Sequence, residues 1–187
     1  MSLRILVAGI GNVLLSDDGI GPCCARHLMA GYEFPPNVEV ADLGTPGLDL
    51  TLHLAEADIV LLIDALRGLV PGTIERYDAS AVSAGRSGTR LETHSPALQE
   101  SIFIARLAGN RPRDVRLVGL AGANFDHGTA LTAGIRQQIP SLVDAVLDEL
   151  TRLDVRWSRR SEVATPDLWW EQPVEHEPHA SGEALKR

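Results

Sequence analysis

The apolar residues of this chain gather in short runs separated by polar turns. Residues 3–9 ("LRILVAG") and 58–66 ("DIVLLIDAL") are apolar with almost no alternation, which is typical of parallel strands covered on both faces. Residues 37–44 ("NVEVADLG") alternate, and residues 114–122 ("DVRLVGLAG") predict the last strand. Residues 73–78 ("TIERYD") follow a Pro-Gly turn with no helix before them, so they predict an antiparallel edge strand.

Helical stretches fall between these strands. The pattern predicts helices at residues 21–30, 48–57 and 96–109, and a longer one at 133–153 that is broken or kinked at Pro140. Alternating strands and helices predict an α/β fold, a three-layer α/β/α sandwich. We expect a mostly parallel sheet of about five strands, phosphorylase/hydrolase-like in type.

The periodic pattern stops after residue 154. Residues 1–154 predict one α/β domain, whereas residues 155–187 contain prolines and charges without a repeat. Such a segment predicts a tail that is either partly disordered or docked. The three tryptophans, Trp157, Trp169 and Trp170, all lie in this tail, which indicates that part of it docks on the domain or on a partner.

The composition of the chain excludes several kinds of binding partner and of catalytic residue. The formal net charge is −8, which argues against nucleic acid or an anionic membrane as the partner. The only cysteines, Cys23 and Cys24, are adjacent, so we interpret them as reduced core residues of a cytoplasmic protein. We expect the protein to act as a monomer. Lys186 is the only lysine, which excludes a P-loop lysine or a Schiff-base lysine in the domain.

Three side chains with metal-binding chemistry lie at the ends of predicted elements. Asp18 follows the first strand, Asp64 closes the strand "IVLLID", and His94 precedes a helix. Ligands of open α/β sheets bind at the carboxyl ends of strands. Two carboxylates and one imidazole can hold a divalent transition metal and leave a position open for water or substrate.

Each of these residues also has an ordinary structural interpretation. An aspartate after a strand often caps a turn or a helix, and a histidine before a helix often does the same. His53 and His127 are competing imidazoles: His53 lies on an apolar helix face and His127 in a loop. The metal-site hypothesis therefore requires the three side chains to converge.

The glycines of the first loop also suggest a nucleotide site, but the motif is incomplete. Gly9 and Gly11 fit the start of G-x-G-x-x-G, whereas Leu14 occupies the third glycine position. Asp17 and Asp18 would repel a pyrophosphate. No G-x-S-x-G motif is present, so a serine-hydrolase mechanism is not indicated.

Several motifs together resemble those of the hydrogenase maturation proteases. They are "GIGNVLLSDDGIGP", "DLGTPGLDL", "ADIVLLIDAL" followed by "PGTI", "THSPAL", and "VGL" with a later "LT". The resemblance extends over residues 3–153. It implies an endopeptidase that trims the C-terminal extension of the nickel-containing large subunit of a [NiFe] hydrogenase, with the large-subunit precursor as its partner.

The resemblance also implies which residues form the site. The family's metal-binding positions correspond to Asp18, Asp64 and His94, and the two carboxylates would activate water. Some members have Glu in the first position, and Asp17 is an alternative first ligand. The metal is either nickel already seated in the precursor or another divalent ion held by the protease. Two other functions stay open, a chaperone that binds the precursor without cutting and a nucleotide-dependent enzyme.

Overall fold

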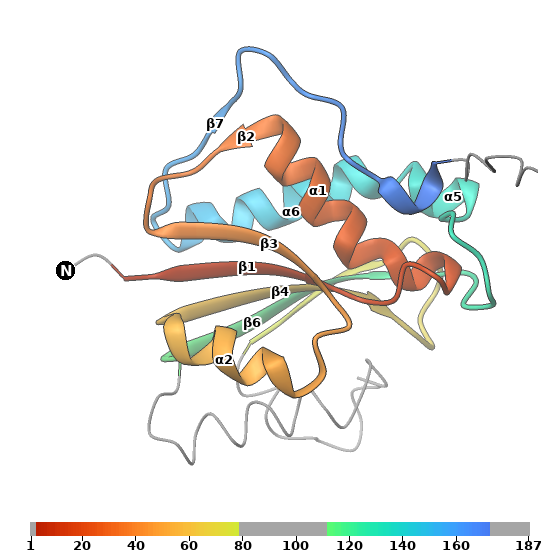
Figure 1. Ribbon diagram of the computed structural model, residues 1–187, viewed down its shortest axis with the longest axis horizontal. Helices are drawn as coiled ribbons and strands as arrows, with labels where there is room; N and C mark the ends of the chain where they lie inside the picture. The colour runs from red at the N-terminus through yellow and green to blue at the C-terminus, as the bar shows by residue number, and fades with distance from the viewer. Residues whose placement is uncertain (1–2, 79–111, 173–187) are drawn as a thin grey trace, which may run out of the picture.

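The described part of the chain folds around one five-stranded sheet. The structure is a computed structural model and describes residues 3–78 and 112–172. The strand order is β3-β1-β4-β6-β5, parallel except for β5 (Figure 1). The strands are β1 (Ile5–Ile10), β3 (Val38–Gly44), β4 (Ile59–Leu66), β5 (Ile74–Tyr77) and β6 (Asp114–Ala121). This confirms the predicted α/β class, the mostly parallel sheet and the antiparallel edge strand.

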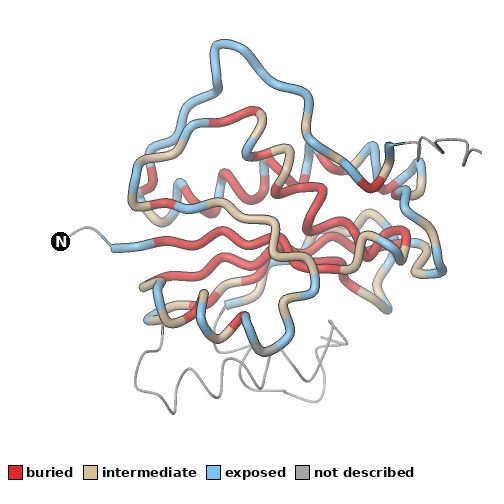
Figure 2. The backbone as a smooth tube through the Cα atoms, in the orientation of Figure 1, coloured by how far each residue is buried: buried red, intermediate tan, exposed pale blue. Residues whose placement is uncertain are grey.

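Helices cover both faces of this sheet. α1 (Ile20–Gly31) and α6 (Ile139–Arg152) lie on one face and α2 (Leu50–Glu56) lies on the other (Figure 1). Every residue of β1 and β4 is buried (Figure 2). Successive side chains of β1 point to opposite faces: Val7 packs in the cluster that contains α1, and Leu6 packs in the cluster that contains α2.

β3 and β4, the next two strands of the sheet along the chain after β1, lie on opposite sides of β1. From β1 the chain crosses by α1 to β3, and from β3 it crosses by α2 on the opposite face to β4, on the other side of β1. Such a switch point leaves a crevice outside the carboxyl ends of the two strands, where open α/β sheets bind ligands. The first loop and the end of β4 meet there.

Two boundaries differ from those that the sequence predicts. β4 continues two residues beyond Asp64, because β6 pairs with it as far as Leu66, whereas β1 pairs with it only as far as Ile63. The predicted helix at 133–153 is broken, as expected, into α5 (Ala133–Arg136) and α6, but the break falls at residues 137–138, so that Pro140 lies in the first turn of α6. Proline suits that position because the first-turn amides need no partner inside the helix.

Residues 155–172 lie against the domain. β7 (Ser158–Arg159) pairs with β2 (Tyr32–Glu33), and the short helix η3 (Trp169–Glu171) lies beside α5 (Figure 1). Val155 and Trp170 are buried in the core cluster of α1 and α6. The division of the chain at residue 154 stays a prediction. The helix predicted at 96–109 and the loop before it lie outside the described residues.

Candidate functional site

The first loop, between β1 and α1, folds back tightly on itself. A side chain at Gly11 would collide with the backbone carbonyl of Asp18, and the φ angle of Gly11 is 141°. A side chain at Gly21 would meet the backbone carbonyls of Ile10 and Ile63. Glycine is needed here because the chain passes within contact of its neighbouring backbone. The glycines therefore bring α1 and the acidic loop onto the ends of β1 and β4.

Asp17 anchors this loop to the loop that follows β6. The Asp17 carboxylate is fully buried and accepts four hydrogen bonds. The donors are the amides of Ala123 (2.8 Å), Asn124 (2.9 Å) and Thr132 (2.7 Å) and the Thr132 hydroxyl (3.0 Å). Both oxygens of Asp17 thus serve to join the two loops.

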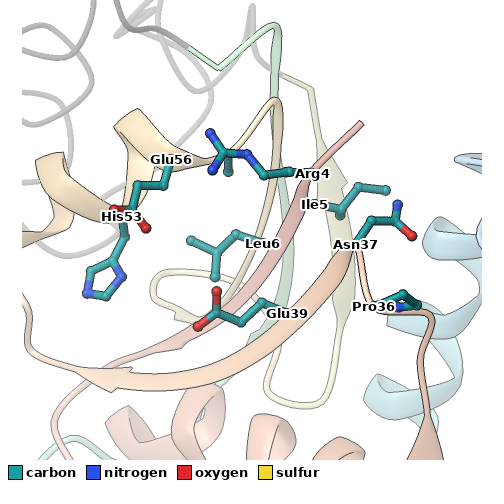
Figure 3. Close-up of a pocket in the computed structure, with 9 residues that line it drawn as sticks. Arg4, Ile5, Leu6, Pro36, Asn37, Glu39, His53 and Glu56 are labelled. Carbon is teal, nitrogen blue, oxygen red and sulfur yellow. The ribbon is translucent and has the colours of Figure 1, made fainter. Parts of the chain in front are cut away.

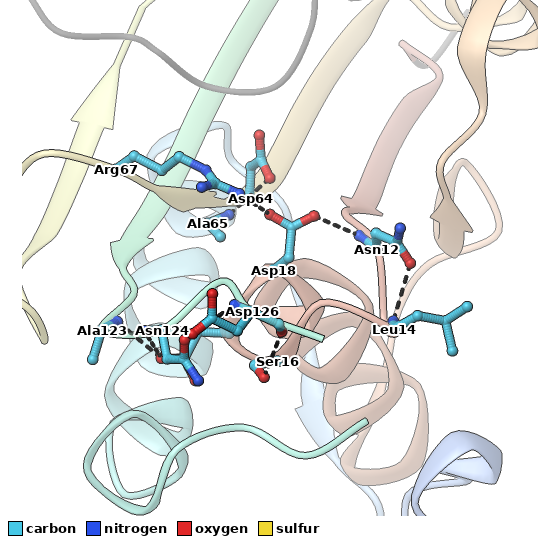
Figure 4. A network of polar contacts seen from close by, with 11 residues as sticks. Asn12, Leu14, Ser16, Asp18, Asp64, Ala65, Arg67, Ala123, Asn124 and Asp126 are labelled. Carbon is cyan, nitrogen blue, oxygen red and sulfur yellow. Dashed lines mark hydrogen bonds and ion pairs between the residues drawn. The ribbon is translucent and has the colours of Figure 1, made fainter. Parts of the chain in front are cut away.

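Asp18 lies on the same short helix, η1 (Ser16–Gly19), and its carboxylate points toward the Asn12 amide and Arg67 (Figure 4). Its side chain is 2% exposed, and its Oδ2 accepts a hydrogen bond from the Asn12 amide at 3.0 Å. Its Oδ1 lies 3.5 Å from Nη2 of Arg67 (Figure 4). This contact connects the first loop to the segment that follows β4.

Asp64 lies within β4, just past the point where the pairing of β4 with β1 stops. It is fully buried, and its Oδ1 accepts a hydrogen bond from the Ala65 amide at 2.8 Å. β4 contacts η1, and Asp64, Arg67 and Asp18 belong to the network drawn in Figure 4. The two predicted carboxylates therefore lie at the same edge of the sheet.

The third predicted ligand, His94, lies outside the described residues. Among residues 3–78 and 112–172, no group of three His, Cys, Asp or Glu side chains is arranged to hold a metal ion. The two carboxylates predicted as ligands, Asp18 and Asp64, lie at this edge, and the three-residue site stays a prediction because it also needs His94. The chemistry of the donor set, two buried carboxylates, fits a divalent cation.

The two competing histidines, His53 and His127, lie in different parts of the structure. His53 lines a hollow at the opposite end of the sheet, with Arg4 at the start of β1 and Glu39 near the start of β3 (Figure 3). His127 is exposed on the loop after β6. Neither forms a metal-binding group with other described side chains.

Cys23 and Cys24 are structural residues, as the sequence predicts. Both are buried in the core cluster between the sheet and α1. Burial, together with the nearby Glu171 carboxylate, raises the pKa of the Cys23 thiol to about 12. Because the thiolate is the nucleophilic form, this cysteine is inert at neutral pH.

Sequence reasoning missed two side chains at the edge, Arg67 and Phe125. The Arg67 guanidinium lies 3.7 Å from the centroid of the Phe125 ring, in addition to its contact with Asp18. Arg67 lies three residues after Asp64 in the sequence, and this closeness could have indicated that it reaches the same edge. Phe125 gave no comparable signal, because the loop after β6 reaches the site only through tertiary contacts.

The sequence model of the hydrogenase maturation protease family matches residues 22–149. This chain belongs to the hydrogenase maturation protease family. The match contains Asp64 and begins after Asp18. The hydrogenase expression/formation protein HupD of Bradyrhizobium diazoefficiens is 36% identical over 160 residues, which cover 84% of this chain and 83% of HupD. The hydrogenase 2 maturation protease of Escherichia coli is 30% identical over 150 residues, which cover 79% of this chain and 91% of that protease.

Solved structures agree with this assignment. The hydrogenase maturating endopeptidase HybD of E. coli matches with a TM-score of 0.77 and 29% identity, over 85% of this chain and 99% of HybD. A solution structure of an endopeptidase from E. coli matches with a TM-score of 0.78 and 30% identity, over 86% and 99%. This hydrogenase maturation protease is therefore an endopeptidase, with the predicted fold. None of its described helices has both the length and the apolar character to cross a membrane.

Proposed function

We propose that this hydrogenase maturation protease removes the C-terminal extension of the nickel-containing large subunit of a [NiFe] hydrogenase. We further propose that Asp18, Asp64 and His94 contact the nickel already seated in that precursor. The observation that carries the proposal is the placement of two buried carboxylates, Asp18 and Asp64, at the switch point of the sheet. Both come from segments whose backbone is fixed by the sheet and by the first loop.

The charge of the edge supports a cation as part of the substrate. Two buried carboxylates repel each other, the positive charge of Arg67 beside Asp18 offsets this only in part, and a divalent cation next to both carboxylates favours their ionised form. Nickel carried by the precursor would relieve this repulsion and would orient the peptide next to the carboxylates. In this proposal the nickel is part of the substrate. A precursor without nickel would bind with its scissile peptide out of line with the carboxylates.

The cleavage step requires a base and a water molecule. One of the two carboxylates, Asp18 or Asp64, accepts a proton from water as the water oxygen attacks the carbonyl carbon of the scissile peptide. The carbon–nitrogen bond then breaks, and the departing amine takes up the proton that the carboxylate accepted from water, which restores the carboxylate. The products are the carboxylate of the mature subunit and the free C-terminal peptide.

The first loop does not provide a phosphate site. Its Asn12 amide donates to Asp18 and its Gly11 amide donates to the Gly44 carbonyl at 2.8 Å. Amides that already have partners inside the protein are not available to a pyrophosphate. The carboxylates of Asp17 and Asp18 add negative charge at the same place, so the geometry favours a cation.

The test compares nickel-loaded and nickel-free large-subunit precursor, each mixed with the full-length protease and followed by mass spectrometry. We expect only the loaded precursor to be shortened. Asp64→Asn should retain the fold by circular dichroism and cut at least about 100-fold more slowly, because a positioned base contributes 10² or more. Asp148→Asn, at a position on α6 whose side chain is 70% exposed, is the matched control and should cut normally.

Three outcomes would contradict the proposal. Equal cleavage of the two precursors would exclude nickel sensing. Normal cleavage by Asp64→Asn would exclude the role of that carboxylate. Tight binding of both precursors without cleavage of either would favour a chaperone that binds the large subunit without processing it.

A further inference from the structure

Arg67 brings a positive charge to the edge where the two carboxylates lie. It follows the end of β4, three residues after Asp64, and its Nη2 lies 3.5 Å from Oδ1 of Asp18. The Asp18 side chain is 2% exposed, whereas the Arg67 side chain is 37% exposed. The arginine therefore approaches a buried carboxylate from the solvent side.

Phe125 holds the guanidinium in this position. The centre of the guanidinium lies 3.7 Å from the centroid of the ring, within the range of a cation–π contact. Phe125 is partly buried against the core cluster, and a side chain at Gly122 would overlap its ring. The ring is thus fixed by packing, and Arg67 rests on it.

The contacts of Arg67 are strong enough to place it and weak enough to be exchanged. A charge-assisted hydrogen bond between guanidinium and carboxylate is about 2.7–2.9 Å long, and the Arg67–Asp18 contact is longer. The guanidinium is partly exposed, so water screens this ion pair on one side and it contributes less than a fully buried pair. A divalent cation that binds Oδ1 of Asp18 would meet the guanidinium at close range, so the two cations exclude each other.

We propose that Arg67 occupies the cation position of the site until the metal of the substrate displaces it. In the free protease the guanidinium neutralises Asp18 and blocks free divalent ions. When the precursor presents its nickel, Arg67 leaves Asp18. The inference rests on the proposed contact between Asp18 and nickel. It makes Arg67 a specificity-determining residue that distinguishes a metal fixed in a substrate from a metal ion in solution.

The experiment measures binding of Ni²⁺ alone to the full-length protease without precursor, by isothermal titration calorimetry. Arg67→Ala and Arg67→Gln should each bind Ni²⁺ about tenfold or more tightly than the wild type, since the competing charge is gone. Arg67→Lys should change the affinity less. Arg159→Ala is the matched control, because Arg159 also lies over an aromatic ring, that of Tyr32 at 5.7 Å, but belongs to β7.

The double variant Asp18→Asn/Arg67→Ala should lose the gain in Ni²⁺ affinity, which assigns the gain to the Asp18 carboxylate. Unchanged Ni²⁺ affinity in folded Arg67→Ala and Arg67→Gln would overturn the inference. So would an equal gain in Arg159→Ala. The proposed function fails by a different result, equal processing of nickel-loaded and nickel-free precursor by the wild type. Loss of processing in the Arg67 variants without tighter Ni²⁺ binding would mean that Arg67 contacts the peptide instead.

Discussion

Asp17 and Asp18 are neighbours in the sequence, yet their carboxylates have different partners. Asp17 accepts hydrogen bonds from three amides and one hydroxyl of the loop after β6. Asp18 accepts a hydrogen bond from the Asn12 amide and contacts Arg67 at the edge of the sheet. At the scale of the residue, the aspartate at position 17 therefore anchors a loop, whereas the aspartate at position 18 is a candidate metal ligand.

The isosteric changes Asp17→Asn and Asp18→Asn should separate the two roles. In Asp17→Asn the new amide group faces donors and leaves a buried N–H unsatisfied, so we expect a loss of about 3 kcal/mol in the free energy of unfolding. In Asp18→Asn the remaining carbonyl oxygen still accepts from Asn12. We expect this variant to unfold within about 1 kcal/mol of the wild type and to fail to process the precursor.

Urea unfolding followed by circular dichroism measures the first effect, and the mass of the precursor measures the second. Each variant is the control for the other, because both remove one negative charge and the two positions are adjacent. A stable but inactive Asp17→Asn, paired with an active Asp18→Asn, would reverse the assignment and make Asp17 the first ligand.

At the scale of the element, the segment after α6 is part of the packed structure. The Arg160 amide donates to the Gly31 carbonyl at 2.9 Å, and the Arg136 guanidinium lies 2.7 Å from the Glu171 carboxylate. Trp170 is 7% exposed and packs in the main core cluster, while Trp169 is 55% exposed. These contacts join residues 155–172 to the end of α1 and to α5.

The two adjacent tryptophans offer a matched pair for testing this docking. Trp170→Ala should lower the free energy of unfolding by about 3 kcal/mol, because it removes a buried aromatic side chain and leaves a cavity. Trp169→Ala should change it by only about 1 kcal/mol, because that side chain is 55% exposed and its ring makes an edge contact with the Trp170 ring. Urea unfolding of each full-length variant gives both values. A Trp170→Ala variant as stable as the wild type would mean that the segment contributes nothing to the core.

At the scale of the whole molecule, the described structure lacks the elements of a general protease. The sequence has no G-x-S-x-G elbow and no H-E-x-x-H motif, and its only lysine is Lys186. The buried cysteine pair is also unsuited to attack, because burial raises the pKa of Cys23 and of Cys24. In the proposed mechanism, Asp18 and Asp64 activate water only after the nickel of the precursor completes the site.

We therefore expect no cleavage of casein or of other unfolded proteins. The assay incubates the protease with casein, with and without added Ni²⁺, and analyses the products by mass spectrometry. Nickel-loaded precursor in the same buffer is the positive control. Casein fragments that appear with the wild type and disappear with Asp64→Asn would show that the site cuts without its specific substrate.

The sequence by itself determined the sheet and the placement of Asp18 and Asp64. Continuous apolar runs predict β1 and β4 because strands covered on both faces exclude polar residues along their length. The end of such an apolar run can be recognised from the neighbouring residues alone. The carboxyl ends of parallel strands lie at one edge of the sheet. Asp18, after β1, and Asp64, which interrupts the apolar run of β4, could therefore be named before the fold was known, although β4 continues two residues beyond Asp64.

Only the tertiary structure decided the role of Asp17, the position of Arg67 on Phe125 and the docking of Trp170. Each depends on contacts between segments far apart in the chain, such as Asp17 with Thr132, 115 residues away. Periodicity carries no information on such pairs, because it reflects only which face of an element is buried. The partner that meets a side chain across the sheet edge is set by how the loops pack, and that is fixed when the whole core assembles.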